Sequence, residues 1–307
     1  RPAHVRDLER DVHARLRGVE RHVVASRRVL ERLAGLRPRR NELRAATDLD
    51  VLDDDARRDA AGNHQPRAAE ERLRPRVGRL LAIDDLADRP HAADVVLDQG
   101  FGAIKLHLTA GRADTLATVA AVREAVGPEV RLMVDAHNIY DVAEAILVGR
   151  ELEAHDVYFF EAPTDPENVA GLAELCAALR VRIATGESER SRFQFRDRLV
   201  NRAVDVVQPD LGYVGLSEMR RIAGLAEAFH VPIAPHLSAG LGVCIAATVN
   251  LMASIPNFLM VEYSPVSFPL ANRFLKEPLV CENGEILLPT GPGLGVEIDE
   301  EALRAYE

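Results

Sequence analysis

The chain has 307 residues, a hydrophobic content of 47% and a formal net charge of −10 at pH 7. This length suffices for one barrel-sized domain of roughly 250 residues with an added segment. The negative charge argues against a nucleic-acid partner, and no apolar run approaches the roughly 20 residues of a membrane helix. Three cysteines in no ligand motif, together with an N-terminus that lacks the features of a signal peptide, predict a cytoplasmic protein.

Residues 1–88 differ in composition from the rest of the chain. Residues 1–100 contain no aromatic residue, no Lys, Met or Cys, and a single Ile, and a core is hard to pack without such side chains. We therefore expect an atypical N-terminal segment over residues 1–88, either helical or disordered, with a short strand at Arg79–Ile83. Two other interpretations stay open: an interaction arm of mixed charge, and a stretch outside the native reading frame. No site residue is expected there.

After residue 88, apolar strands alternate with amphipathic helices. Strands are expected at Phe101–Leu108, Val130–Asp135, Tyr158–Glu161, Ile183–Glu187, Val204–Asp210, Val231–His236 and Phe258–Tyr263. Helices are expected at His91–Gly100, Thr115–Val126, Asp141–Leu152, Val169–Leu179, Phe193–Asn201, Leu216–Phe229 and Gly242–Ala253. Near the C-terminus, Val280–Leu287 reads as a hairpin on an Asn-Gly turn.

Six of these strands end in a polar residue at an almost constant spacing. The residues are Asp135, Glu161, Glu187, Asp210, His236 and Glu262, at intervals of 26, 26, 23, 26 and 26. A period of about 25 residues holds one strand, one helix and two loops, which is typical of a parallel β/α barrel. An acid after a single strand is often only a helix cap, but six in register predict a site at the C-terminal face. We expect an α/β fold with a TIM-type barrel over residues 89–268 and a C-terminal tail over 269–307.

One further strand carries two polar residues on one side. Lys105 and His107 lie two positions apart, so both are expected to point into the barrel, while Ile104, Leu106 and Leu108 face the helices. Lysine is rare in this Arg-rich chain, which favours a need for a compact cation inside the barrel.

These residue types suit one kind of chemistry. The carboxylates Asp135, Glu161 and Glu187 offer hard oxygen ligands for Mg²⁺. Asp210 could orient His236 as a base. A divalent ion with a His base is the combination needed to remove a proton α to a carboxylate, because the resulting enediolate requires stabilisation.

Residues from about 90 to 303 resemble the mandelate racemase/muconate lactonizing branch of the enolase superfamily. The motifs are Lys105-Leu106-His107, Val134-Asp135-Ala136-His137, Phe160-Glu161-Ala162-Pro163, Thr185-Gly186-Glu187-Ser188, Gln208-Pro209-Asp210, Ala234-Pro235-His236, Val261-Glu262-Tyr263 and the closing segment Pro289–Gly295. The resemblance implies the modified barrel of that superfamily, Mg²⁺ on the three carboxylates and His236 as the base. It also implies that Glu262 hydrogen-bonds the enediolate and that Lys105 contacts the substrate carboxylate.

Two histidines indicate which members of this branch the chain resembles. His137 is similar to the general acid of galactonate dehydratase and related acid-sugar dehydratases, which protonates the departing 3-hydroxyl. His107 stands where the family often has a second Lys, which weakens a racemase interpretation, although this His could serve the other face of the substrate.

The resemblance therefore implies a lyase of carbohydrate acid catabolism that converts an aldonate or aldarate to a 2-keto-3-deoxy acid, with a sugar acid as its small-molecule partner and a homo-oligomeric assembly. A racemase or epimerase of a 2-hydroxy acid, or an impaired barrel remnant, is the alternative. The family has an α+β capping domain before the barrel, and nothing in residues 1–88 resembles it.

Overall fold

The computed structural model describes residues 76–77, 79–83, 99–108, 111–237, 240–264 and 267–305, with the backbone alone for 76–83. All of them belong to one compact unit, Arg72–Glu307. The expectations for residues 1–75, and most of the helix expected at His91–Gly100, lie outside these ranges. No helix in the described part of the chain is long and apolar enough to cross a membrane.

Seven parallel strands form the central sheet, in the order β7-β6-β5-β4-β3-β2-β8. They are β2 Arg79–Ile83, β3 Ala103–His107, β4 Arg131–Asp135, β5 Val157–Glu161, β6 Arg182–Thr185, β7 Val206–Val207 and β8 Val261–Tyr263. Ile233 closes the sheet, because it bridges Val207 on one side and Phe258 on the other. The expected parallel β/α barrel is therefore confirmed.

Two strands differ from their expected form. The short strand expected at Arg79–Ile83 is present and lies between β3 and β8, so the sheet includes residues before position 89. The division at residues 88 and 268 stays a prediction. The strand expected at Val231–His236 is reduced to the bridge at Ile233, because Pro232 and Pro235 have no N–H to donate to a ladder.

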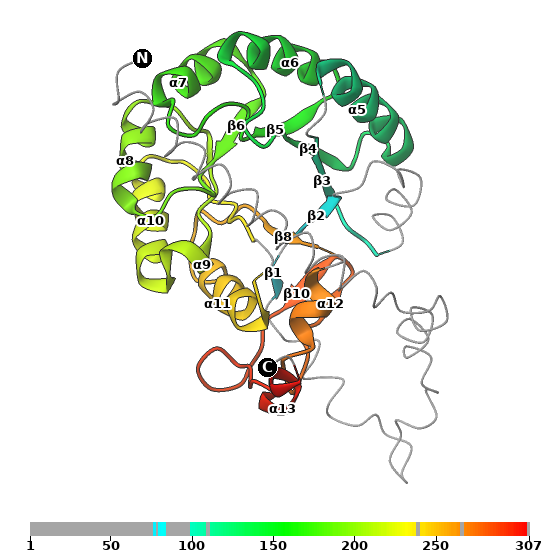
Figure 1. The fold of residues 1–307 in the computed structure, drawn as a ribbon, viewed down its shortest axis with the longest axis vertical. Helices are drawn as coiled ribbons and strands as arrows, with labels where there is room; N and C mark the ends of the chain where they lie inside the picture. Colours follow the sequence, from blue (N-terminus) through cyan, green and yellow to red (C-terminus); the bar gives the residue numbers. More distant parts are fainter. Residues whose placement is uncertain are drawn as a thin grey trace, which may run out of the picture. The chain divides into compact units, whose positions relative to one another are not determined.

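Helices follow the strands and surround them, as Figure 1 shows for α5 to α11. They are α5 Arg112–Val126, α6 Val142–Ala154, α7 Val169–Ala178, α8 Arg192–Val200, α9 Leu211–Val214, α10 Leu216–Ala228 and α11 Gly242–Met252. Their ends follow local chemistry. Asp141 caps α6 by accepting from the Glu144 N–H at 2.8 Å, and Gly127 ends α5 at a φ of 74°, where glycine has no Cβ penalty.

The barrel interior is built in layers along the strands. An apolar layer of buried side chains comes first, formed by Ala103, Met133, Phe159, Ala184, Val206, Ala234 and Met260. Side chains alternate along a strand, so the residues two positions further on also point inward. Six of these seven positions hold polar residues: Lys105, Asp135, Glu161, Gln208, His236 and Glu262. The fold thus places a polar ring directly above an apolar plug.

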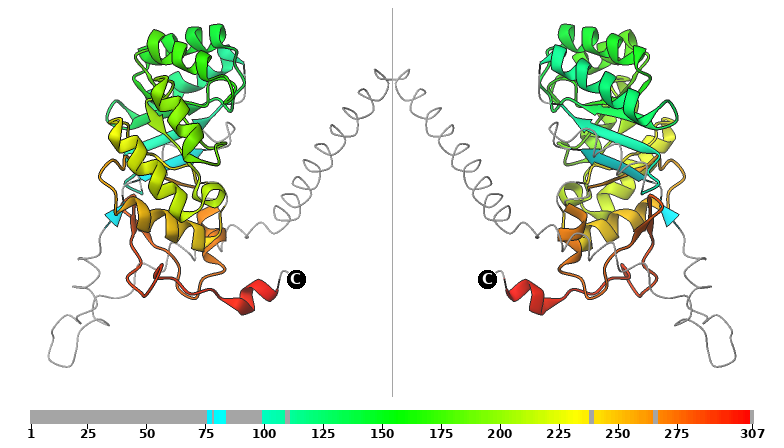
Figure 2. Two further views of the ribbon diagram at one scale, coloured as in Figure 1. Left: turned by 90° about the vertical axis from the view of Figure 1, so that its left-hand side faces the viewer. Right: turned by 90° about the vertical axis from the view of Figure 1, so that its right-hand side faces the viewer.

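The C-terminal tail forms a small separate sheet. β9 (Cys281–Glu282) and β10 (Glu285–Leu287) pair antiparallel across Asn283 and Gly284, both at positive φ, which confirms the expected hairpin. β1 (Arg76–Val77) pairs with β10. Helices α12 (Ser267–Asn272) and α13 (Glu300–Arg304) complete the tail, and the side views of Figure 2 show its orange and red segments near α11.

Candidate active site

A buried lysine lies at the centre of the polar ring. Lys105 is fully buried on β3, and its Nζ donates to both carboxylate oxygens of Glu161, at 2.9 and 3.0 Å, and to Glu262. Asp135 lies 3.8 Å away. Burial alone favours the neutral amine, but the surrounding carboxylates outweigh it and hold the pKa of Lys105 well above its ordinary range. The lysine is therefore a fixed positive charge inside the barrel.

Three carboxylates gather around this charge. Oxygen atoms of Asp135, Glu161 and Glu187 lie within 4.8 Å of one another, as expected from the sequence. Burial raises the pKa of Glu161 to about 7, with further contributions from Asp135 and Glu262, while Lys105 opposes the shift. A single lysine thus leaves this carboxylate short of compensating charge, and a buried anion needs such compensation.

The donor set fits a hard divalent cation. Asp135 and Glu161 are buried, Glu187 is half-buried, and Asp135 Oδ2 accepts no hydrogen bond within the described residues. Carboxylate oxygens are the ligands that Mg²⁺ prefers, with water and substrate oxygens completing its shell. The residues present therefore fit a Mg²⁺ site.

A histidine–aspartate pair borders the carboxylates. Nδ1 of His236 lies 2.8 Å from Asp210 Oδ2, and its Nε2 lies 3.4 Å from Glu187 Oε2. Burial favours the neutral imidazole, but the Asp210 hydrogen bond and the charge of Glu262 raise the pKa of His236 to about 9. Asp210 occupies Nδ1, so Nε2 is the nitrogen that faces the carboxylate cluster.

Glu262 contacts both Lys105 and the backbone beside His236. One oxygen accepts from Lys105 and the other accepts from the Leu237 N–H at 2.9 Å. Burial favours its neutral form, but Lys105 and His236 lower the pKa of Glu262. The carboxylate is thus an anion that contacts both the central lysine and the backbone next to His236.

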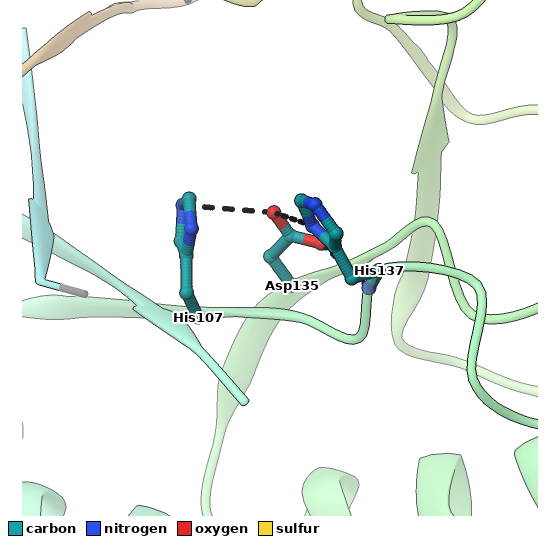
Figure 3. Close-up of side chains that lie close together, drawn as sticks. All are labelled: His107, Asp135 and His137. Carbon is teal, nitrogen blue, oxygen red and sulfur yellow. Dashed lines mark hydrogen bonds and ion pairs between the residues drawn. The ribbon is translucent and has the colours of Figure 1, made fainter. Parts of the chain in front are cut away.

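Two imidazoles flank the remaining carboxylate. Figure 3 shows His107 and His137 on either side of Asp135, with the carboxylate between the rings. His107 Nε2 and His137 Nδ1 each lie 3.5 Å from Asp135 Oδ2. The interaction with Asp135 raises the pKa of His137, whose side chain is 54% exposed. Asp135 therefore favours the protonated form of His137, and the ring is accessible from the solvent side.

All nine site residues expected from the sequence thus lie in one connected cluster, and their individual roles stay predictions. One member was missed. Gln208 is 2% exposed, and its Nε2 donates to Glu161 Oε2 at 2.7 Å. Its position, two residues before Asp210 and in register with the other inward-facing positions, is the signal that could have found it.

A glycine makes room for this amide. Gly186 has a φ of 141°, and a Cβ there would lie 2.9 Å from the backbone nitrogen of Gln208 and 2.7 Å from Phe195. β6 therefore contributes to the cluster through the next residue, Glu187, instead of through an inward side chain at position 186.

Comparison with known proteins now decides the family. Residues 88–302 match the family model described as "Enolase C-terminal domain-like". The chain belongs to this family, in the mandelate racemase/muconate lactonizing enzyme branch of the enolase superfamily. The sequence resemblance is therefore confirmed.

Several members of the enolase superfamily are similar to it. A D-galactarolactone cycloisomerase of Agrobacterium fabrum is 38% identical over 233 residues, which cover 73% of this chain and 61% of the relative. An arabinonate dehydratase of Saccharolobus solfataricus is 33% identical over 68% of this chain and 56% of the relative. The crystal structure of a racemase from Streptomyces coelicolor A3(2) with bound magnesium superposes with a TM-score of 0.68 at 28% identity, over 76% of this chain and 64% of that one. The chain spans 61% of the length of the cycloisomerase and 56% of that of the arabinonate dehydratase, and 46% and 50% of the dehydratases of D-xylonate and D-galactonate that it also matches.

Proposed function

We propose that this chain carries the catalytic barrel of a Mg²⁺-dependent acid-sugar dehydratase, which converts an aldonate or aldarate to a 2-keto-3-deoxy acid. The observation that carries the proposal is the meeting of Asp135, Glu161 and Glu187 beside the His236–Asp210 pair. A hard-cation site next to an oriented imidazole suits removal of a proton α to a carboxylate.

The base would be Nε2 of His236. The hydrogen bond from Nδ1 to Asp210 fixes the ring and favours a proton on Nδ1, so Nε2 can accept the α-proton of the substrate. Asp210 is itself held, because its other oxygen accepts from the Gly212 N–H at 2.7 Å. Lys105 would place a positive charge close to the substrate carboxylate, where negative charge accumulates as the proton leaves.

A divalent ion held by Asp135, Glu161 and Glu187 would supply a positive charge that stabilises the enediolate and offsets the carboxylates that raise the pKa of His236. This compensation matters because a histidine with a pKa of about 9 is already protonated at neutral pH. The free imidazole is the form that can act as a base.

Loss of water requires an acid as well as a base. His137 is suited to this role, because Asp135 raises its pKa and its side chain is exposed toward solvent. It would protonate the hydroxyl on the carbon next to the enediolate, so that water leaves. The resulting enol would then tautomerise to the 2-keto-3-deoxy product.

The names of the relatives support a sugar acid as the substrate. They include dehydratases that act on arabinonate, D-xylonate and D-galactonate. A second reaction also has support, because the relative that is 38% identical is a cycloisomerase of D-galactarolactone. Isomerisation of a sugar-acid lactone through the same α-proton abstraction is therefore the second candidate. It is preferred over the racemase alternative, which His107 disfavours.

Product mass distinguishes these reactions. The full chain, with Mg²⁺, is incubated in D₂O with a panel of aldonic acids, aldaric acids and their lactones. Dehydration lowers the substrate mass by one water and yields a 2-keto acid. Cycloisomerisation gives an isomer, whose mass equals that of the substrate once incorporated deuterium is subtracted. Racemisation only replaces the α-proton by deuterium.

Two variants test the assigned roles. His236→Asn is expected to abolish both α-deuteration and product, whereas His137→Asn should abolish dehydration and leave α-deuteration. His230→Asn is the matched control, since His230 is exposed at the end of α10. Folded protein that binds Mg²⁺ but neither deuterates nor converts any compound of the panel contradicts the proposal.

A further inference from the structure

The cluster around Asp135 contains a second group of ligand atoms, which shares Asp135 with the three carboxylates. His107, Asp135 and His137 each offer one ligand atom, and these atoms lie within 4.8 Å of one another; the contacts to Asp135 Oδ2 come from His107 Nε2 and His137 Nδ1. In Figure 3 the two imidazoles point toward the same carboxylate oxygen from opposite sides. Two nitrogens and one oxygen are a different donor set from the three carboxylates next to them.

The spacing of these atoms is that of ligands around a small cation. Each imidazole nitrogen lies 3.5 Å from Asp135 Oδ2, which is longer than the ~2.7–3.2 Å of ordinary N–H···O hydrogen bonds. Ligand atoms at the corners of a tetrahedron with ~2.0–2.1 Å metal bonds lie about 3.3–3.4 Å apart. Two of the three pairs already have nearly this spacing, and the two imidazole nitrogens, which lie within 4.8 Å of each other, would have to approach to complete it.

The carboxylate at the centre, Asp135, is the ligand that the two groups share. The Asp135 side chain is 1% exposed, and its Oδ2 accepts no hydrogen bond in the described parts of the chain. Its other oxygen, Oδ1, is already occupied by the His137 backbone N–H at 2.9 Å. The side-chain nitrogens of His107, His137 and Lys105 lie 3.5–3.8 Å from Oδ2, beyond ordinary hydrogen-bond length, and a cation between the two imidazoles would contact this oxygen directly.

We propose that His107, Asp135 and His137 form a second cation site, selective for a borderline transition-metal ion such as Zn²⁺. Imidazole is a good ligand for Zn²⁺ and its neighbours in the first transition row, whereas Mg²⁺ prefers oxygen. Three protein ligands leave the fourth position of a tetrahedral ion for water. The half-exposed side of His137 is where that water would enter.

Asp135 belongs to both donor sets, so the two sites are coupled. A Zn²⁺ ion that engages Asp135 Oδ2 competes for a carboxylate of the Mg²⁺ cluster. It also occupies Nδ1 of His137, the residue proposed as the acid. Binding at the second site therefore lowers the affinity for Mg²⁺ and, by linkage, Mg²⁺ lowers the affinity for Zn²⁺ by the same factor.

The test measures binding and does not depend on turnover. The full chain is titrated with Zn²⁺ by calorimetry at saturating Mg²⁺, and with Co²⁺ while the visible absorption that marks tetrahedral coordination is recorded. Four variants are compared: His107→Gln, His137→Asn, Glu187→Gln and His230→Asn. Asn suits position 137, where φ is 52°, because Asn tolerates this conformation better than most residues.

The expected result separates the two sites. His107→Gln and His137→Asn each lower Zn²⁺ affinity by more than about 100-fold, since loss of a direct ligand exceeds the effect of an outer-shell change, and each abolishes the tetrahedral Co²⁺ bands. Glu187→Gln, which alters only the Mg²⁺ cluster, keeps both signals, and so does His230→Asn. Circular dichroism checks that each variant is folded.

Three outcomes overturn the proposal. They are Zn²⁺ affinity that is unchanged in both His107→Gln and His137→Asn, loss of the Co²⁺ bands in Glu187→Gln, and Co²⁺ spectra of octahedral type only. The second outcome would place the ion among the three carboxylates instead. None of these results bears on whether the barrel dehydrates sugar acids.

Discussion

Nδ1 of His236 lies 2.8 Å from Oδ2 of Asp210. This contact joins the residues that follow two neighbouring segments of the barrel, β7 and the segment that contains Ile233. Asp210 begins helix α9 and caps it through the Gly212 N–H. Because the carboxylate is fixed by a helix, it holds the imidazole in one orientation. The state of His236 should therefore respond directly to changes at Asp210.

Replacing Asp210 with Asn is expected to lower the pKa of His236. The Asp210 hydrogen bond is the main contribution that raises this pKa to about 9, and burial acts in the opposite direction. An amide at position 210 still caps α9 but has no charge. NMR titration of the imidazole in the presence of a chelator measures the shift. The control is Asp197→Asn, which changes an exposed carboxylate of α8. A His236 pKa that stays near 9 in Asp210→Asn would show that this pair does not set it.

The pKa of His236 also predicts how stability depends on pH without a divalent ion. The folded-state pKa of about 9 lies above the ordinary value of about 6.5 in an unfolded chain, so the folded state binds the proton more tightly. The stabilisation is fully present below about pH 6.5 and is lost as pH rises through about 9. It amounts to at most roughly 3 kcal/mol.

Urea unfolding of the wild type and of His236→Asn measures this effect. The difference between their free energies of unfolding should be largest near pH 6 and should shrink toward about pH 10. A difference that is constant over this range would mean that the histidine has the same pKa in both states.

Mg²⁺ should stabilise the folded chain through the three carboxylates. An ion that binds only the native state adds about 2.7 kcal/mol at a concentration 100 times its Kd. Glu187→Gln should remove most of this gain while leaving the fold intact, because Glu187 is only half-buried. Thermal unfolding with and without Mg²⁺ measures it. Glu174→Gln, on the exposed face of α7, should respond to Mg²⁺ like the wild type.

Gln208 should tune the metal cluster through Glu161. Its amide donates to Glu161 Oε2 and lowers the pKa of that carboxyl, against the effect of burial. Gln208→Leu keeps the volume but removes the donor, so Mg²⁺ affinity should fall by roughly 10–100-fold. Calorimetry tests this, and Gln208→Glu is informative beside it, because a second carboxylate next to Glu161 should raise that pKa further. Unchanged affinity in Gln208→Leu would make the amide a packing residue.

The sequence predicted the barrel and most of the candidate site for a simple physical reason. Strand ends repeat at intervals of 23 to 26 residues, and alternation along β3 placed Lys105 and His107 on one side. Both patterns are properties of local geometry. An acid or an imidazole at the end of an apolar run is also conspicuous, because such a group is costly to bury.

Features that depend on contacts between distant segments could not be read in this way. Gln208 carries no charge, and its role follows from the contact with Glu161, 47 positions away in the chain. The pairing of β1 with β10 joins residues 76–77 to the C-terminal hairpin. The apolar pattern predicted a full strand at Val231–His236, but only Ile233 pairs with its neighbours, because the prolines on either side of it have no N–H to donate.

Gly186 offers a test of how closely the ring is packed. It has a φ of 141°, a conformation that side chains other than glycine rarely adopt, and a Cβ would meet Phe195 at 2.7 Å and the Gln208 nitrogen at 2.9 Å. Gly186→Ala should therefore lower the free energy of unfolding by about 2 kcal/mol or more, through backbone strain and overpacking. It should also weaken Mg²⁺ binding, because Glu187 follows directly.

Gly224→Ala is the matched control, with an effect of opposite sign. Gly224 lies within α10, and a Cβ there meets nothing within 4 Å. Alanine should stabilise the helix by roughly 0.5–1 kcal/mol and leave Mg²⁺ affinity unchanged. Urea unfolding and calorimetry on both variants measure these effects. Equal stability of the two variants would mean that the loop after β6 can relax, and that Glu187 does not depend on the glycine before it.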